Sequence, residues 1–386
     1  MKKKINRKIY YLNAYTNDRH CIGREKSIAA NNKIEYILSS IPNDFRVYNL
    51  SLAQSKSGAC NRVIVNEDNI VYHYSPSLSA SSKYRFQFIK AYWLCFLLFK
   101  VRRSDSIIVY HSIFWIKLIS VLKRIKKFRL ILEINDFYQF YYKGKQRDEL
   151  KHSEEVFFRI ADNYILANPR MKLSLPSKRS LVNYGAYKVV EEIDGSSESN
   201  IINVLYSGIV ERMRNAAFLA IESVLYLPEN YKLHMACFGT EEDIKILKKR
   251  IKEINEELNR HAIVFRGTLS TDSLNELMCA CDISLNCHSY IQEEAYYADY
   301  SFPSKIPVNM GAGLIVVSSK IGTIDSLPFD DAIVYFENDN PKDIADAIKK
   351  CKHLVNKRDV PKRIIRKLDE DFRDGLQSLL SEGASR

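Results

Sequence analysis

Short apolar runs alternate with longer stretches of helical spacing along most of the chain. The run Ile9–Asn13 is apolar, and Arg24–Ser40 has apolar residues at the spacing of one helix face. Further runs rich in β-branched and aromatic residues lie at Phe45–Leu50, Ile70–Tyr74, Ser106–Tyr110, Leu130–Ile134 and Tyr164–Ala167. Helical stretches at 84–103, 113–125 and 147–160 separate the later runs. This alternation predicts parallel strands with helices on both faces of the sheet.

A polar segment interrupts the pattern near the middle of the chain. Residues Glu191–Asn200 include a glycine and three serines and have no periodicity, which predicts a linker. After it, strands are expected at Asn203–Ser207, Lys232–Phe238, Ile263–Arg266, Ile283–Asn286 and Leu314–Ser318, with helices between them. We therefore predict an α/β protein with two doubly wound, Rossmann-like domains facing a cleft, at residues 1–188 and 201–358. A helical segment at 359–386 is expected to return to the first domain.

Length and composition agree with this organisation. A chain of 386 residues fits two domains, and 46% hydrophobic with 27% charged residues is typical of a globular protein, which excludes disordered and fibrous classes. The longest apolar run, Ala91–Phe99, is far shorter than the roughly 20 residues that cross a bilayer as a helix. We find no signal peptide, so we expect a cytoplasmic protein, either soluble or peripheral on the inner face of the plasma membrane.

The net charge of +12 calls for an anionic partner. The basic residues form no single block, so nucleic acid is not expected. They gather instead around apolar helices between Lys83 and Arg129, mixed with aromatic side chains such as Trp93, Phe96 and Phe99. This mixture suits an anionic membrane surface or a lipid-diphosphate acceptor. The alternative is an ordinary solvated helix face.

The eight cysteines indicate a reducing compartment and free thiols, because they are neither dense nor paired in short loops. Cys279, Cys281, Cys287 and His288 resemble a metal cluster only superficially. Residues two apart on a helix face different sides, and a core strand is expected at 282–286. No metal site is predicted.

The segment from Ser301 to Ser319 has the features of a diphosphate site. Pro303 ends a loop, Ser304 is a good helix N-cap, and Gly313 ends the helix before a buried strand. A helix start with free N–H groups, a serine hydroxyl and the ammonium of Lys305 suits a diphosphate. The alternative is a capped helix with a structural role only.

This segment resembles the donor-site signature of GT4-type retaining glycosyltransferases, and the likeness extends from Ile9 to about Ile348. The resemblance implies the two-domain GT-B fold. It also implies transfer of a sugar, with retention of anomeric configuration, from a nucleoside diphosphate sugar to a glycan or lipid-diphosphate-linked glycan. Such a reaction would belong to bacterial capsule, O-antigen or exopolysaccharide biosynthesis, with no metal or other cofactor.

In the first domain, the resemblance assigns roles to five residues. Gly23 corresponds to a glycine loop whose backbone approaches the donor diphosphate, unless it is a simple turn glycine. His111 corresponds to a catalytic histidine that contacts the donor sugar near the reacting carbon, unless it is a core histidine. Glu133, Asn135 and Asp136 end a strand where polar residues line the acceptor cleft.

In the second domain, the resemblance places a donor-binding set. Gly208 allows close backbone approach, and Arg214 stands at a phosphate-binding lysine. Ile209 replaces the usual arginine, so Arg212 is a candidate to supply the missing cation. The other members are Gly239, Ser304 and Lys305. Thr240 and Asp243 form an expected capping box at the next helix.

The sequence departs from the family at its paired glutamates. Val308 stands at the ribose-binding position and Tyr300 at the position near the sugar. Asp299, or Glu293 and Glu294, are candidates to replace the latter. This departure leaves two alternatives open. One is a non-catalytic GT-B subunit that activates another glycosyltransferase, and the other is a GT-B sugar-nucleotide epimerase.

Overall fold

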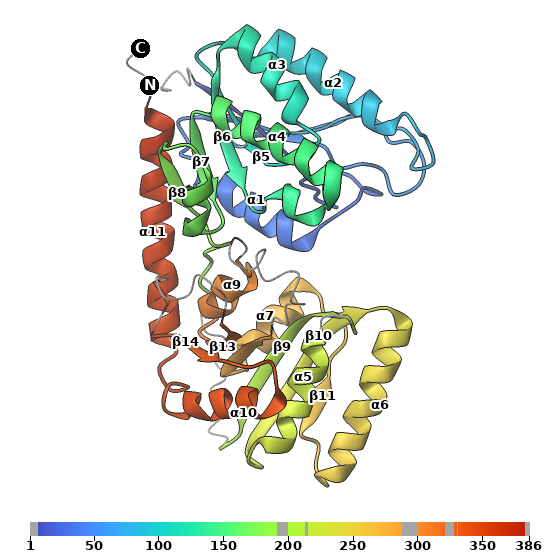
Figure 1. Ribbon diagram of the computed structural model, residues 1–386, viewed down its shortest axis with the longest axis vertical. Coiled ribbons are helices and arrows are strands. Elements are labelled where there is room, and N and C mark those ends of the chain that lie inside the picture. Colours follow the sequence, from blue (N-terminus) through green and yellow to red (C-terminus); the bar gives the residue numbers. More distant parts are fainter. Residues whose placement is uncertain are drawn as a thin grey trace. The chain divides into compact units, whose positions relative to one another are not determined.

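The computed structural model describes residues 7–190, 200–212, 215–287, 300, 302–320, 328–329 and 331–382. The chain divides into two compact units (Figure 1). Unit 1 contains Met1–Ala186 and Asp371–Arg386, and unit 2 contains Tyr187–Glu370. The boundary between the units, at Ala186 and Tyr187, precedes the expected linker Glu191–Asn200. Residues 191–199 of that linker lie outside the described residues. Of the carboxy-terminal segment, the part from Asp371 onward groups with unit 1.

Unit 1 is built on an eight-stranded sheet in the order β3-β4-β2-β1-β5-β6-β7-β8. Its strands are β1 (Lys8–Asn13), β2 (Arg46–Ser51), β3 (Val63–Glu67), β4 (Ile70–Tyr74), β5 (Ser106–Tyr110), β6 (Arg129–Ile134), β7 (Asn163–Leu166) and β8 (Ser180–Val182). All neighbours are parallel except β3 and β4. The sequence did not predict β3, because this edge strand is largely exposed and lacks a buried apolar run.

Helices pack on this sheet through their apolar faces. They are α1 (Ile28–Ser40), α2 (Arg85–Lys100), α3 (Ile116–Lys126) and α4 (Gly144–Ile160), with the short 3-10 helices η1 (Tyr138–Tyr141) and η2 (Pro169–Ser174). The end of α11 (Asp359–Ser381) belongs to the same unit. There Phe372 packs its ring 5.6 Å from that of Tyr36, and Arg373 donates to the carbonyl of Ser39 at 3.0 Å.

Unit 2 has a six-stranded, fully parallel sheet in the order β11-β10-β9-β12-β13-β14. Its strands are β9 (Ile202–Val210), β10 (Tyr231–Gly239), β11 (Ile263–Phe265), β12 (Ile283–Asn286), β13 (Ile315–Ser319) and β14 (Ile333–Phe336). Its helices are α5 (Ala216–Ser223), η3 (Val224–Tyr226), α6 (Glu241–Glu257), α7 (Thr271–Cys279), α9 (Lys305–Gly311), α10 (Pro341–Lys350), η6 (Cys351–His353) and the start of α11. The predicted strands are confirmed, and β14 and α10 extend the pattern beyond them.

The carboxyl ends of β9 and β10 approach each other closely at Gly239. A Cβ atom added at this glycine would lie 2.7 Å from the backbone oxygen of Val210, its register partner on β9. Because that oxygen belongs to the main chain, it cannot move aside without shifting a central strand. Gly239 is therefore required by packing, in addition to the strand-end role that the sequence suggests.

Replacing Gly239 with alanine is expected to destabilise unit 2 by about 1–3 kcal/mol, the usual cost of overpacking. Gly58→Ala is a matched control, because a Cβ atom there meets nothing within 4 Å. Urea unfolding followed by circular dichroism measures both variants. Equal stability of the Gly239 variant and the wild type would show that the two strand ends are not packed as described.

Candidate functional site

Two polar regions lie where ligands usually bind in open parallel sheets. Such sheets bind ligands at the carboxyl ends of their strands, at the point where the strand order reverses. In unit 2 this point lies between β9 and β12, and in unit 1 it lies at β1, which has β2 on one side and β5 on the other.

At the strand-order reversal of unit 2, Lys305 and Gly208, two of the expected donor-binding residues, lie side by side. Lys305 begins α9, and its Nζ donates a hydrogen bond to the backbone oxygen of Ser207 at 3.3 Å. A Cβ atom at Gly208 would stand 3.7 Å from that Nζ. A side chain at Gly208 would therefore contact the ammonium and the Tyr206 ring.

The ammonium of Lys305 has no anionic partner among the described residues. It lies 5.5 Å from the centre of the Tyr206 ring, and burial lowers its pKa, with the nearby Cys287 acting in the opposite direction. Burial also raises the pKa of Cys287 to about 12, so this thiol is neutral at pH 7. Lys305 is partly buried, and a partly desolvated cation with no counter-charge in the described part of the chain costs stability, which an anionic ligand would relieve.

Ser304 precedes α9 but does not cap it, which corrects the sequence-based expectation. Its backbone is already helical, with φ −59° and ψ −13°, and its side chain makes no capping hydrogen bond. The chain enters the helix one residue earlier, where the carbonyl of Pro303 accepts the N–H of Ile306 at 3.0 Å. Gly313, with φ +87°, follows the end of the helix as predicted.

Arg212 is held by two carboxylates at the start of α6. Its Nε donates to Asp243 at 2.7 Å, and a terminal nitrogen lies 3.1 Å from Glu242. The predicted capping box is confirmed, because the N–H of Asp243 donates to Thr240 Oγ1 at 3.1 Å. The charge of Arg212 is thus balanced within unit 2. Arg214 and Asp299 lie outside the described residues.

Val308 belongs to an apolar cluster under α9. Its side chain is partly buried against the buried residues Leu205, Ala236, Met278, Cys281, Ala312 and Leu314. On the same helix, Asn309 donates a hydrogen bond to Ser284 Oγ on β12. The resemblance places a ribose-binding carboxylate at this position. Here the position holds Val308, whose side chain packs against the hydrophobic cluster.

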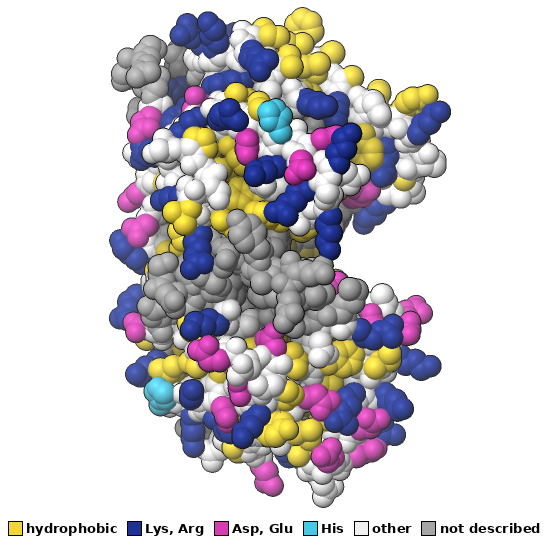
Figure 2. Space-filling view, in the orientation of Figure 1, with side chains coloured by type: hydrophobic (Ala, Val, Ile, Leu, Met, Phe, Trp, Pro, Cys, Tyr) yellow, Lys and Arg dark blue, Asp and Glu magenta, His cyan; other side chains and the backbone are white. Residues whose placement is uncertain are grey.

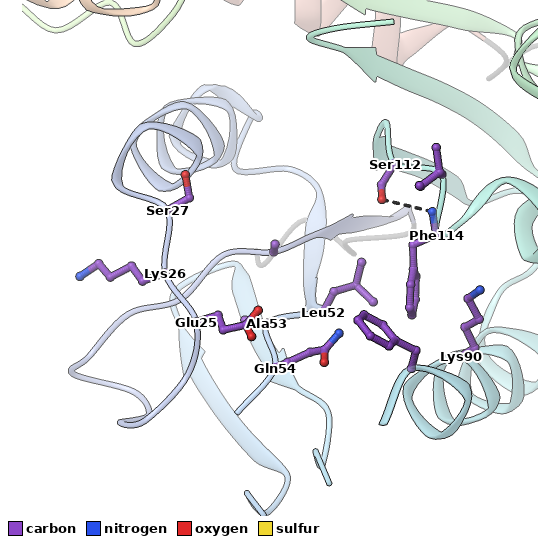
Figure 3. Close-up of a pocket in the computed structure, with 12 residues that line it drawn as sticks. Glu25, Lys26, Ser27, Leu52, Ala53, Gln54, Lys90, Ser112 and Phe114 are labelled. Atoms are coloured by element: carbon purple, nitrogen blue, oxygen red, sulfur yellow. Dashed lines mark hydrogen bonds between the residues drawn. The ribbon is translucent and has the colours of Figure 1, made fainter. Parts of the chain in front are cut away.

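In unit 1, a hollow of about 740 Å³ lies at the carboxyl ends of β1, β2 and β5 (Figure 3). We call it the unit 1 hollow. It is lined by residues from five separate chain segments, namely Ala14, Glu25, Lys26, Ser27, Leu52, Ala53, Gln54, Phe86, Lys90, Ser112, Ile113 and Phe114. Sequence reasoning named none of these as site residues, although the predicted glycine loop leads into the wall formed by residues 25–27.

Gly23 has φ +81°, a left-handed conformation that favours glycine. Nothing lies within 4 Å of the position of an added Cβ atom, and the Gly23 carbonyl accepts the N–H of Lys56 at 2.8 Å. The turn conformation alone accounts for a glycine here. Contact with a diphosphate stays a prediction.

His111 follows β5 but turns its imidazole into the interior. Its Nδ1 lies 3.3 Å from the carbonyl of Asp136, and its Nε2 lies 3.3 Å from Glu154 Oε1. Burial lowers the pKa of His111 to about 4 and raises that of Glu154 to about 7. The histidine is therefore neutral at pH 7, and its side chain does not line the unit 1 hollow. Its catalytic role stays a prediction.

Glu133, Asn135 and Lys33 form a buried polar network. Glu133 is fully buried and accepts hydrogen bonds from the Tyr11 hydroxyl and, at 3.2 Å, from Asn135 Nδ2. Lys33 donates to Asn135 Oδ1. Burial raises the pKa of Glu133, which Lys33 opposes. Only Asn135 and Asp136 of the expected acceptor set are partly exposed, and the acceptor role of all three stays a prediction.

Comparisons with known proteins agree with this geometry. Residues 202–353 match the family model described as glycosyl transferases group 1. No curated protein matches the chain. The trehalose-6-phosphate structure from E. coli bound with UDP-2-fluoro glucose has a TM-score of 0.66 at 11% identity, covering 98% of this chain and 100% of that one.

Two further solved structures are similar over nearly their whole length. The α,α-trehalose-phosphate synthase (UDP-forming) from Burkholderia xenovorans, in complex with glucose-6-phosphate, has a TM-score of 0.65 at 12% identity, covering 96% of this chain and 99% of that one. Anabaena HepE in complex with UDP has a TM-score of 0.63 at 12% identity, covering 97% and 98%. The chain thus has the two-domain α/β fold of GT-B glycosyltransferases, and its residues 202–353 are similar to glycosyl transferases group 1.

Proposed function

We propose that this protein transfers a sugar from a nucleoside diphosphate sugar to a glycan or lipid-diphosphate-linked glycan in bacterial surface-polysaccharide biosynthesis. The observation that supports this most is the ammonium of Lys305 beside Gly208, which has no anionic partner among the residues that the structure describes and lies at the strand-order reversal of the segment that matches glycosyl transferases group 1. An anionic donor placed there would supply the missing counter-charge. The structurally similar HepE was solved with UDP, and the E. coli structure with UDP-2-fluoro glucose.

In the proposed reaction, Lys305 stabilises the charge that develops on the departing diphosphate. Positive charge placed in advance near a leaving group is among the most effective sources of catalysis, because it needs no rearrangement during the reaction. On sequence grounds alone, Arg214 is proposed to join Lys305 at the diphosphate, and Asp299 and His111 to act near the sugar. We also propose that the transferred sugar keeps its anomeric configuration and that the reaction needs no metal ion.

A binding screen tests the proposed donor site. The purified chain should be stabilised on heating by nucleoside diphosphates or their sugars, since a ligand at 100 times its Kd stabilises by about 2.7 kcal/mol. The screen should include UDP, GDP, ADP and dTDP with EDTA present. A shift that needs added Mg²⁺ would contradict metal independence, and no shift with any nucleotide would contradict the donor site.

We further propose that unit 1 associates with an anionic membrane surface. No helix in the described part of the chain is long and apolar enough to cross a membrane. However, α2 and α3 expose Phe99, Val121 and Ile125 next to the exposed cations of Lys100, Arg102, Arg103, Lys117 and Arg124. Figure 2 shows hydrophobic side chains together with lysines and arginines over these helices. Apolar and basic side chains on one surface suit anionic lipid headgroups.

Co-sedimentation with vesicles measures this association. Binding is expected with vesicles of phosphatidylglycerol but not of phosphatidylcholine, and it should fall as salt rises, because charges are screened beyond about 10 Å at 0.1 M. Val121→Ser with Ile125→Ser should reduce binding several-fold. Ile64→Ser, at an exposed apolar residue of β3, is the control. Equal recovery with the two lipids would remove the proposal.

A further inference from the structure

The unit 1 hollow combines an apolar wall with a polar group and a cation that have no polar or charged partner in the part of the chain that the structure describes. Phe86 and Phe114 line it with ring centres 6.1 Å apart, and Leu52 and Ala53 add further apolar surface. Its volume of about 740 Å³ falls in the usual range for small-ligand sites, about 300–1,000 Å³. The hollow also lies at the strand-order reversal of the sheet, which is the expected ligand position in this architecture.

Gln54 supplies the polar group. The residue is only 9% exposed, it lines the hollow, and its Oε1 atom has no hydrogen-bond partner among the described residues. Figure 3 shows Gln54 between the start of α1, at Ser27, and the side chains of Phe114 and Lys90. A buried carbonyl oxygen without a donor costs about 1–3 kcal/mol. Rotation of the amide toward the hollow would let the O–H or N–H groups of a ligand satisfy this oxygen.

The charges around the hollow leave Lys90 without a carboxylate among the described residues. Glu25 lies 3.7 Å from the guanidinium of Arg85, and Lys26 lies 2.9 Å from Asp18, so both of these charges are balanced within unit 1. Lys90 has no carboxylate partner among the described residues, and its Nζ lies 4.7 Å from the centre of the Phe114 ring.

The amino end of α1, a 13-residue helix, adds positive potential on the opposite wall, because Ser27 is its N-cap. Together, Lys90 and this helix start favour a negatively charged group in the ligand.

We infer that the unit 1 hollow binds an acidic sugar, a pyranose bearing a carboxylate or a phosphate. The C–H face of a sugar ring packs on the aromatic wall, a ring hydroxyl donates to Gln54 Oε1, and the acidic group lies between Lys90 and the start of α1. Neutral lipid tails lack the hydroxyl donors, and free inorganic anions lack the apolar face. The inference rests on the proposed function, in which this sugar is the accepting unit of the glycan.

The affinity of the full chain for three probe sugars tests this site. The probes are glucuronic acid, glucose 6-phosphate and glucose, and their binding is measured by calorimetry and saturation-transfer NMR in the presence of saturating UDP. At least one acidic sugar should bind about tenfold more tightly than glucose, and comparison of the two acidic probes distinguishes carboxylate from phosphate. Lys90→Gln should abolish the preference for the acidic probe. Phe86→Ala and Gln54→Leu should each weaken binding of all bound sugars about fivefold or more.

Matched controls lie on or next to the same helix but outside the hollow. Phe88→Ala changes a partly exposed aromatic residue of α2, and Lys83→Gln removes an exposed cation just before it. Neither should alter sugar binding. Equal affinity for acidic and neutral sugars, no binding of any probe, or binding insensitive to Phe86, Gln54 and Lys90 would overturn the inference. Acidic sugar binding at this hollow without any UDP binding would uphold it and contradict the donor site in unit 2.

Discussion

Replacing Lys305 with methionine is expected to weaken nucleoside diphosphate binding tenfold to a hundredfold. A hydrogen bond to a charged group contributes about 1.5–3 kcal/mol, and each 1.4 kcal/mol corresponds to a factor of ten in affinity. The same change should leave the stability of the free protein unaltered or raise it. The reason is that Lys305 is desolvated without a carboxylate partner among the described residues, and methionine removes that cost.

Lys320→Met is the matched control for this variant. It removes the same charge from the same unit, but Lys320 is exposed and lies 3.5 Å from Glu337. Calorimetric titration with the best nucleotide, together with urea unfolding of the free proteins, measures both properties. Unchanged nucleotide affinity in a folded Lys305→Met protein would place the diphosphate elsewhere. A marked loss of stability would show that the ammonium is satisfied within the chain.

Val308→Glu restores the carboxylate of the family pattern but is expected to destabilise unit 2 by several kcal/mol. The new side chain would enter the cluster around Leu205, Met278 and Leu314, and burying a carboxylate among apolar side chains is costly. Its pKa would rise, so the penalty should be small near pH 4 and grow as the pH increases toward 7, because the folded state then has to hold a charged group.

Val308→Gln and Val308→Leu separate charge from size in this experiment. Glutamine matches the shape of glutamate and should cost stability at every pH alike, whereas leucine should be nearly neutral. Urea unfolding at pH 5 and pH 8 gives the comparison. A Val308→Glu protein as stable as the wild type at pH 8, with tighter nucleotide binding, would instead indicate a ribose pocket ready to accept the carboxylate.

The sequence predicts those features whose physical signal lies within a few neighbouring residues. Buried parallel strands such as Ile283–Asn286 are continuous apolar runs, and the Thr240 capping box is a spacing of three residues, so both were predicted correctly. The resemblance assigns Lys305 and Gly208 to one donor site, and the two residues are neighbours in the structure, but their role at a diphosphate stays a prediction. The edge strand β3 was missed because its side chains alternate only weakly between buried and exposed positions.

Features that depend on distant segments could not be read from the sequence. The unit 1 hollow brings Gln54 together with Phe86 and Ser112, which only the strand order β2-β1-β5 places at one edge. Likewise, the burial of His111 depends on Glu154 and on the packing of α4. Ser304 has the residue type of an N-cap, but the preceding backbone decides where the helix begins, and that conformation has no local sequence signal.

Turnover by the purified protein is the direct test of whether this chain is itself a glycosyltransferase. The measurement is release of nucleoside diphosphate from UDP-, GDP-, ADP- and dTDP-sugars, with glucuronic acid and glucose 6-phosphate as acceptors, for the wild type and Lys305→Met. We expect release with at least one donor, accelerated by an acidic acceptor and at least tenfold slower in the variant. No release with any donor, together with stimulation of a second glycosyltransferase by the wild-type chain, would contradict it and identify a non-catalytic partner subunit.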